Sequence, residues 1–116
     1  MNDPAIPVIR LLSEAEPYTQ DEPGEAYFHM LMQKDEIPGM QMGHVHLKGP
    51  IHKTPGAHDE FHQTYFIYEG AATIHLRDEQ RTLQAPAVIM IPKATMHSVE
   101  VAEGNELRYV FVNQFR

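Results

Sequence analysis

The residues best suited to chemistry lie in two stretches, residues 51–70 (IHKTPGAHDEFHQTYFIYEG) and residues 91–99 (IPKATMHSV). The first holds three histidines, two adjacent acids and an amide, and the second places His97 at the start of a later strand. Imidazole, carboxylate and side-chain carbonyl groups are the donors that bind first-row transition metals. The sequence therefore predicts a metal site, provided that the fold brings the two stretches together.

Short strands separated by turns must position these residues. Within residues 40–47 (MQMGHVHL), His44 and His46 share one face while Val45 and Leu47 share the other, because strand side chains alternate. No segment shows a sustained helical period, so the chain is predicted to be all-β, an antiparallel sandwich or barrel. Further strands are predicted at residues 27–32, 63–68, 72–77, 87–91 and 107–115.

The first 25 residues have a different character. They contain four prolines and six acidic residues, a density that breaks any long helix. Residues 8–12 form the one short apolar element, which fits either a strand at a sheet edge or an arm that crosses to a second subunit. We therefore predict an extended N-terminal arm over residues 1–25 and a β-barrel domain over residues 26–116.

The first stretch resembles the first motif of the cupin superfamily, specifically of its small single-domain members. In that motif a His-x-His pair is followed by a glutamate and, seven positions later, by a glycine. Gly70 matches the glycine, Gln63 stands where the family usually has glutamate, and His58 matches the second histidine of the pair. The first histidine would fall on Gly56, so that ligand is missing.

The second stretch resembles the second cupin motif, which combines a glycine, a Pro-x-Gly-x-x-His run and an asparagine. Pro92 and His97 match this motif. Pro86 and Ala94 replace its glycines, and Val101 stands at the asparagine position. The spacing between the two motifs agrees with the shortest linkers of the family.

The resemblance covers roughly residues 40–115 and implies an antiparallel double-stranded β-helix, or jelly-roll barrel, with His58, Gln63 and His97 as metal ligands. A tight site needs a further imidazole, and we expect His62, four residues after His58, to supply it. Because adjacent residues of a plain strand point to opposite faces, His62 and Gln63 could bind together only at a bulge or bend.

Other assignments remain open. A shorter spacing of the first motif would instead place the histidine pair at Ala57 and Asp59. A satisfied core histidine is the alternative role for both His58 and His97, and Gln63 could merely form a hydrogen bond inside the barrel. The other candidates for the third imidazole are His44, His46 and His52.

The neutral amide of Gln63 has a chemical consequence. It leaves a bound ion with more positive charge than a carboxylate would, which favours Lewis-acid chemistry. It also counts against the two-histidine, one-carboxylate set typical of iron oxygenases. We therefore expect a divalent transition metal, Zn²⁺ or Ni²⁺ rather than Fe²⁺ or Mn²⁺. An apolar pocket for a small organic substrate is expected from Tyr65, Ile67, Met90 and Phe111.

Three functions are consistent with such a site. The resemblance to the small cupin cyclases and isomerases of polyketide-type metabolism implies a metal-dependent enzyme acting on a small carbonyl or aromatic compound. A non-haem metal dioxygenase is the second, with Asp59 or Glu60 as its carboxylate. The third is a non-enzymatic ligand-binding or sensor cupin. No general acid or base is singled out by the sequence.

The composition argues against some classes of binding partner. The 116 residues carry a formal net charge of −7 with scattered Lys and Arg, so neither a nucleic acid nor a membrane is expected as a partner. The absence of cysteine excludes disulfides, and no signal peptide or apolar span is recognised, so we expect a cytoplasmic protein.

The C-terminal residues 107–115 are apolar on both faces, which predicts a homodimer.

Overall fold

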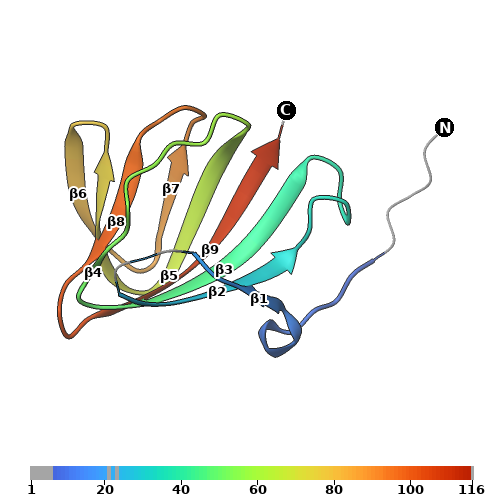
Figure 1. Ribbon diagram of the computed structural model, residues 1–116, viewed down its shortest axis with the longest axis horizontal. Helices are drawn as coiled ribbons and strands as arrows, with labels where there is room; N and C mark the ends of the chain where they lie inside the picture. Colours follow the sequence, from blue (N-terminus) through green and yellow to red (C-terminus); the bar gives the residue numbers. More distant parts are fainter. Residues whose placement is uncertain (1–6, 21, 23, 116) are drawn as a thin grey trace.

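A computed structural model describes residues 7–20, 22 and 24–115, and Figure 1 shows them as a strongly curled antiparallel sheet. Besides a short 3-10 helix, η1 (Leu12–Glu14), the described residues form nine strands, which confirms the all-β prediction. The described residues contain no helix that is long and apolar enough to cross a membrane. The strands are β1 (Glu16–Tyr18), β2 (Glu25–Met32), β3 (Met40–Lys48), β4 (Ile51–His52), β5 (Phe61–Leu76), β6 (Glu79–Gln84), β7 (Ala87–Ile91), β8 (His97–Val101) and β9 (Glu106–Phe115).

Strand β5 belongs to both halves of the barrel. Up to Gly70 it pairs with β9 and β7, and after Gly70 it pairs with β6 and β8. We call the first set, in the order β1–β2–β3–β9–β5–β7, sheet A, and the second, β4–β8–β5–β6, sheet B.

Gly70 is the residue at which the chain passes from one sheet to the other. Its φ of 94° lies in the left-handed region, and a register shift between Ile67 and Glu69 precedes it. The sequence predicted a break between two strands here. The structure instead has one strand of 16 residues with a bend, because glycine adopts a positive φ without a steric penalty.

The register of β3, β9 and β5 arranges the inner face of sheet A in rows that run across the strands. Directly opposite residues of an antiparallel pair point to the same face, so each row gathers side chains from two or three strands. Along the strands the inner face changes from aliphatic through aromatic to amide. In that order the rows are Leu47–Leu107, Val45–Tyr109–Ile67, Gly43–Phe111–Tyr65 and Gln41–Asn113–Gln63.

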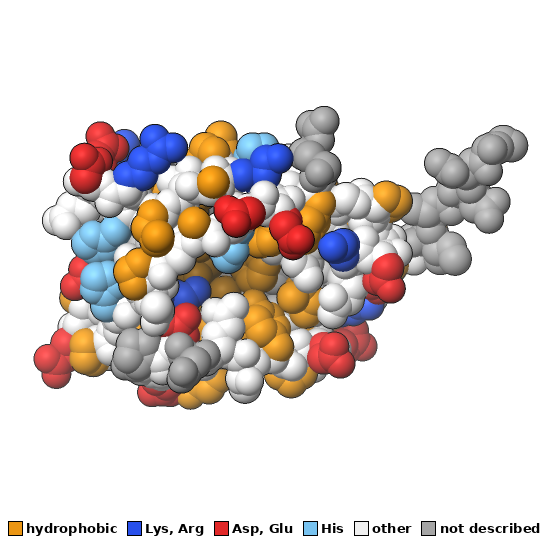
Figure 2. Space-filling view, turned by 45° about the horizontal axis from the view of Figure 1, so that its top comes forward, with side chains coloured by type: hydrophobic (Ala, Val, Ile, Leu, Met, Phe, Trp, Pro, Cys, Tyr) orange, Lys and Arg blue, Asp and Glu red, His pale blue; other side chains and the backbone are white. Residues whose placement is uncertain are grey.

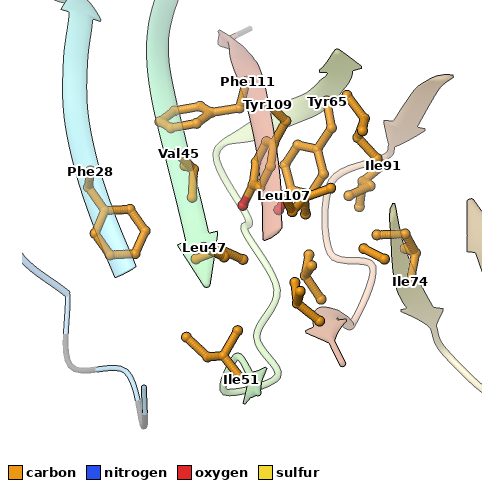
Figure 3. Packing of buried hydrophobic residues seen from close by; sticks show 14 residues of the cluster. Phe28, Val45, Leu47, Ile51, Tyr65, Ile74, Ile91, Leu107, Tyr109 and Phe111 are labelled. Carbon is orange, nitrogen blue, oxygen red and sulfur yellow. The ribbon is translucent and has the colours of Figure 1, made fainter. Parts of the chain in front are cut away.

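The aliphatic rows form the hydrophobic core. Leu47, Ile67 and Leu107 are fully buried, and Ile74 of sheet B packs in the same cluster. Figure 3 shows the labelled side chains of both sheets pointing into the space between them. Burial of each such side chain contributes roughly 1.5–3 kcal/mol to the stability of the fold. The aliphatic rows therefore stabilise one end of the barrel, and the aromatic and amide rows at the other end line a cavity.

The described part of the N-terminal arm lies along the edge of sheet A. The edge strand is β1, which pairs with β2, whereas residues 8–11 form no strand and Leu12 begins η1. Arg10 also ties the arm to the barrel, because its guanidinium donates two hydrogen bonds, of 3.0 and 2.8 Å, to the Glu36 carboxylate. Residues 1–6 of the predicted arm lie outside the described residues, and the division of the chain at residue 25 stays a prediction.

Candidate functional site

The aromatic and amide rows surround a cavity of about 310 Å³. Its walls include Phe28 and Phe61 as well as Tyr65, Tyr109 and Phe111. Figure 2 shows the molecule hollowed near the middle of one face, with hydrophobic side chains deep in the hollow. Pockets that bind small organic molecules measure roughly 300–1,000 Å³, so this cavity suits a small ligand.

The cavity depends on a glycine opposite the Phe111 ring. A Cβ atom at Gly43 would lie 2.2 Å from the Phe111 ring, so only glycine leaves room for the aromatic side chain in this row. Tyr65 and Tyr109, whose ring centroids are 4.6 Å apart, continue the aromatic wall. Burial raises the pKa of both phenols, so both hydroxyl groups keep their protons at neutral pH.

The amide row gives the cavity one polar wall. Gln63 Nε2 donates a hydrogen bond of 2.8 Å to Asn113 Oδ1, and Asn113 Nδ2 donates one of 2.9 Å to Gln41 Oε1. The remaining amide oxygen, Gln63 Oε1, is buried and has no hydrogen-bond partner among the described residues. A buried acceptor without a partner costs about 1–3 kcal/mol, so this oxygen is suited to bind a donor or an ion that enters the cavity.

The two remote histidine stretches meet at the edge of this cavity. Gly56 and His97 form an antiparallel bridge with backbone hydrogen bonds of 3.0 and 2.9 Å, which holds the segment before β5 against the start of β8. As a result the His58 and His97 ring centroids lie 5.2 Å apart, and both rings line the cavity together with Gln63. The structure thus brings together three of the four predicted metal ligands.

Both imidazoles are held in the neutral form. Burial lowers the pKa of His58 and His97, and the nearby Lys53 lowers both further, although the Thr95 carbonyl raises that of His97. His97 Nδ1 lies 2.8 Å from the Thr95 carbonyl oxygen, which can only accept, so Nδ1 carries the proton. Nε2 of His97 is therefore a free lone pair, able to accept a hydrogen bond or bind a metal ion.

His62, the fourth predicted ligand, lies elsewhere. Strand β5 is in regular register from Phe61 to Ile67, so His62 and Gln63 point to opposite faces. The bulge that both would have needed is absent from this part of the strand, and His62 Nδ1 accepts a hydrogen bond of 3.2 Å from the Lys93 N–H. The structure does not bring His62 to the cavity.

Of the four residues predicted to line the pocket, two line the cavity and two lie elsewhere. Tyr65 and Phe111 line the cavity, as expected, and Ile67 is buried in the core. The prediction is wrong for Met90, which is 58% exposed. Met90 pairs with Thr64, whose side chain alternates with that of Tyr65, and it therefore lies on the outer face of sheet A.

Lys53 and Glu22 are cavity-lining residues that the sequence analysis missed. Lys53 is only 15% exposed, and its Nζ lies 4.0 Å from Glu22 Oε2. Burial lowers the pKa of Lys53, and the Glu22 charge opposes that shift. Strand alternation from Ile51 could have placed Lys53 on the inner face, whereas nothing in the sequence around Glu22 indicated that the arm would reach the cavity.

The other candidate histidines lie outside the cavity. His44 bonds to the Tyr68 hydroxyl, His46 Nε2 lies 2.6 Å from Glu106 Oε1, and His52 Nε2 lies 3.1 Å from Ser98 Oγ. Their partners belong to the outer faces of the two sheets, so these three imidazoles are not available to the interior site. Asp59 and Glu60 are exposed and do not line the cavity.

His44 predicts an acid-dependent loss of stability. Burial lowers its pKa, and the charges of Arg108, His29 and His46 lower it further. The unfolded chain therefore takes up this proton more readily, so the stabilisation is present above the ordinary histidine pKa of about 6.5 and is lost as pH falls below it. We expect urea unfolding at about pH 7.5 and about pH 5.5 to show a smaller loss of stability in His44→Gln than in the wild type. Equal losses in the two proteins would contradict this assignment.

A family model now places the chain among known domains. The model described as the AraC-like ligand binding domain matches residues 38–114, which include both histidine stretches. The chain belongs to this family of AraC-like ligand binding domains. None of the curated protein sequences compared with this AraC-like domain matches it.

Solved structures share the fold of this AraC-like domain. A cupin-like protein from Thermotoga maritima is 18% identical over 86% of this chain and 77% of that chain, with a TM-score of 0.76. A predicted oxalate decarboxylase from the same organism is 17% identical over 94% and 100%, with a TM-score of 0.84. The polyketide cyclase RemF from Streptomyces resistomycificus is 16% identical over 94% and 80%, with a TM-score of 0.81. These likenesses confirm the jelly-roll barrel, and together with the family match they confirm the cupin resemblance.

Proposed function

We propose that this domain binds a small hydroxylated organic molecule in the barrel cavity. The observation that carries the proposal is the pair of free acceptors at its polar wall, Gln63 Oε1 and His97 Nε2. Acceptors without partners select a ligand that brings its own donors, and a hydroxyl group is the simplest such donor. The family match to a ligand binding domain supports the same proposal.

The aromatic wall of the cavity indicates that the ligand also has an apolar face. Tyr65, Tyr109 and Phe111 cover an apolar or flat face, and such a wall excludes water from the hydrogen bonds at the polar end. Lys53 adds one buried donor beside the two neutral imidazoles. A small phenol, hydroxy acid or sugar combines the required hydroxyl donors with an apolar face.

Ligand binding is tested by thermal unfolding in the presence of small phenols, hydroxy acids and monosaccharides. A ligand at about 100 times its Kd stabilises the folded state by roughly 2.7 kcal/mol, which raises Tm by several degrees in a domain of this size. We expect this rise to disappear in His97→Phe and Gln63→Leu, which remove one acceptor each.

The matched control is His46→Gln, which removes an imidazole from the outer face and leaves the cavity intact. We expect its Tm to rise with ligand as in the wild type. A rise that persists in His97→Phe and Gln63→Leu would place the ligand outside the cavity. If none of the three compound classes raised the Tm of the wild type, the proposed ligand class would be wrong.

A metal-dependent enzyme is the second candidate, and the meeting of His58 and His97 favours it. Two imidazoles and the unpartnered Gln63 oxygen are donors that Zn²⁺ and Ni²⁺ accept, so the residues fit such an ion in kind. When bound, the ion would act as a Lewis acid toward a carbonyl or enolate. The Lys53 charge, which lowers the pKa of both His58 and His97, also opposes a second cation at this place, and for that reason we place ligand binding first.

The structural neighbours are compatible with both candidates. A polyketide cyclase and a predicted oxalate decarboxylase are enzymes by name, whereas the matching family is described by ligand binding. A dioxygenase using Asp59 or Glu60 receives no support, because both side chains are exposed and neither lines the cavity.

The outer face of sheet A is proposed to pair two copies of the chain. Cross-strand register places Phe66 beside Val88 of β7 and Val110 of β9, with Tyr68 and Met90 nearby on the same face. Phe66, Tyr68, Val88 and Met90 are all exposed, so a contiguous apolar surface faces outward. Such a surface is typical of a protein–protein interface.

The homodimer is tested by Val88→Asp, which places a charge on this apolar face. Burying an unpaired charge at an interface costs at least about 2 kcal/mol, so the dimer dissociation constant should rise roughly thirtyfold. Light scattering at micromolar concentration measures the change. Thr82→Asp, at an exposed position in β6 of sheet B, is the control and should stay dimeric. A monomeric wild type would refute the proposal.

A further inference from the structure

The outer face of sheet B gathers two histidines and a glutamate from three strands. His52 of β4 pairs directly with Glu100 of β8, and His75 of β5 pairs with Ser98, two residues before Glu100 on the same face. His52 and Glu100 are exposed, and His75 is half-buried. Three chain segments that are far apart in sequence therefore present their side chains at one place on the surface.

The donor atoms of these residues are close enough to share an ion. One ring nitrogen of each histidine and one carboxylate oxygen of Glu100 all lie within 4.8 Å of one another. His75 Nε2 is 3.0 Å from Glu100 Oε1, and the His52 and His75 rings stack with centroids 4.9 Å apart. Tetrahedral Zn²⁺ with ligand distances of about 2.0–2.2 Å needs its donors roughly 3.3 Å apart, which small side-chain rotations would achieve here.

This cluster is separate from the cavity. On β8 the side chains of Val99 and Val101 are buried in the core, so the alternating residues Ser98 and Glu100 face outward. The interior histidines, by contrast, lie on the cavity side of the barrel. An ion bound at the outer face would therefore share no donor with the interior site.

We propose that His52, His75 and Glu100 form a binding site for a divalent transition-metal ion, with Zn²⁺ as the best-matched ion. Two imidazoles and one carboxylate are a donor set that Zn²⁺ accepts, and water would complete its coordination. Mg²⁺ and Ca²⁺ prefer all-oxygen sets and match it less well. The three donors stand on paired strands rather than on loops, which holds them near the required geometry.

The ion would fasten strand β4 to the barrel. Strand β4 has only two residues, which pair with Val101 and Glu100 of β8, and the Lys53 N–H directly after it donates to the Val99 carbonyl. The chain that follows β4 carries Lys53 and His58 to the cavity. An ion shared by β4, β5 and β8 would therefore hold in place the segment that forms one wall of the ligand cavity.

Calorimetric titration of the full chain with Zn²⁺ alone tests the site. The double variant His58→Asn/His97→Asn lacks the interior imidazoles, and a chelator first removes any bound metal. We expect this variant to bind one Zn²⁺ per chain. Adding His52→Asn or His75→Asn should weaken binding at least about tenfold, because losing a ligand costs no less than losing an outer-shell partner of a metal site. His46→Asn is the matched control, since it also removes a strand histidine bonded to a glutamate, and should leave binding unchanged.

The wild-type chain gives an independent readout that does not require the interior variant to fold. One equivalent of Zn²⁺ should shift the imidazole NMR signals of His52 and His75. It should also slow hydrogen exchange of the Lys53 N–H, which donates to the Val99 carbonyl directly after β4. Responses confined to His58 and His97, or Zn²⁺ binding unaffected by His52→Asn, would overturn the site. Unchanged exchange at Lys53 would overturn the proposed hold on β4.

Discussion

Replacement of Gly70 by alanine is expected to lower the free energy of unfolding by more than about 4 kcal/mol, a large part of the roughly 5–15 kcal/mol of an ordinary domain. An alanine Cβ would lie 1.9 Å from the backbone carbonyl oxygen of Glu106, and the φ of 94° is itself unfavourable for a side chain. Strand β9 cannot retreat, because Gly70 pairs with Leu107 and Leu107 is fully buried in the core. Urea unfolding followed by circular dichroism measures the loss.

Substitutions at two other glycines distinguish the effect of the positive φ from the effect of the contact with Glu106. Gly104 also has a positive φ, of 86°, but a Cβ there would meet nothing within 4 Å, so Gly104→Ala should cost only about 1–2 kcal/mol. Gly56→Ala has neither the positive φ nor the contact and should be close to neutral. Similar losses in Gly70→Ala and Gly104→Ala would show that the contact with Glu106 is not what requires glycine at position 70.

Gly56→His is expected to raise the affinity of the interior site for Zn²⁺ by roughly a hundredfold, because a ligand contributes no less than an outer-shell partner, whose loss costs about 10–100-fold in affinity. Gly56 lines the cavity and forms an antiparallel bridge with His97, and directly opposite residues point to the same face. A Cβ at this position meets no atom within 4 Å, so the new imidazole has room beside those of His58 and His97. The substitution supplies the ligand that is missing from the first histidine pair.

This change is measured by competition with a chelator in the His52→Asn/His75→Asn background, which removes the proposed outer site. Gly56→Phe fills similar space without a donor atom and is the matched control. An equal affinity in Gly56→His and Gly56→Phe would mean that position 56 does not face the ion. A gain in Gly56→His alone would support His58 and His97 as ligands of the same ion.

Motif spacing predicted which loop residues meet, and the structure shows why this worked. The second motif places His97 at the start of β8, and the first places Gly56 and His58 before β5. The bridge between Gly56 and His97 joins these segments through two backbone hydrogen bonds. Since this pairing is made by backbone groups, it requires neither a histidine at position 56 nor a glutamate at position 63.

The error over His62 has an equally local cause. His62 was preferred because it follows His58 by four residues, but the segment from His58 to Phe61 is not a continuous strand. Once β5 begins at Phe61, alternation alone decides the faces, and it places Gln63 inward and His62 outward. Applying the period of two from the first residue of β5 would have excluded His62 from the cavity.

The sequence by itself determined strands β2, β3, β7 and β9 and the faces of β3, because side-chain alternation acts within a few neighbouring residues. It did not determine that β5 continues through the bend at Gly70 as one strand. Only the tertiary structure decided which faces meet. The amide row of Gln41, Asn113 and Gln63 joins positions up to 72 residues apart, and the outer His52, His75 and Glu100 cluster joins three strands. Hydrogen-bond register between strands sets these neighbours, and register depends on how the whole barrel closes rather than on any local pattern.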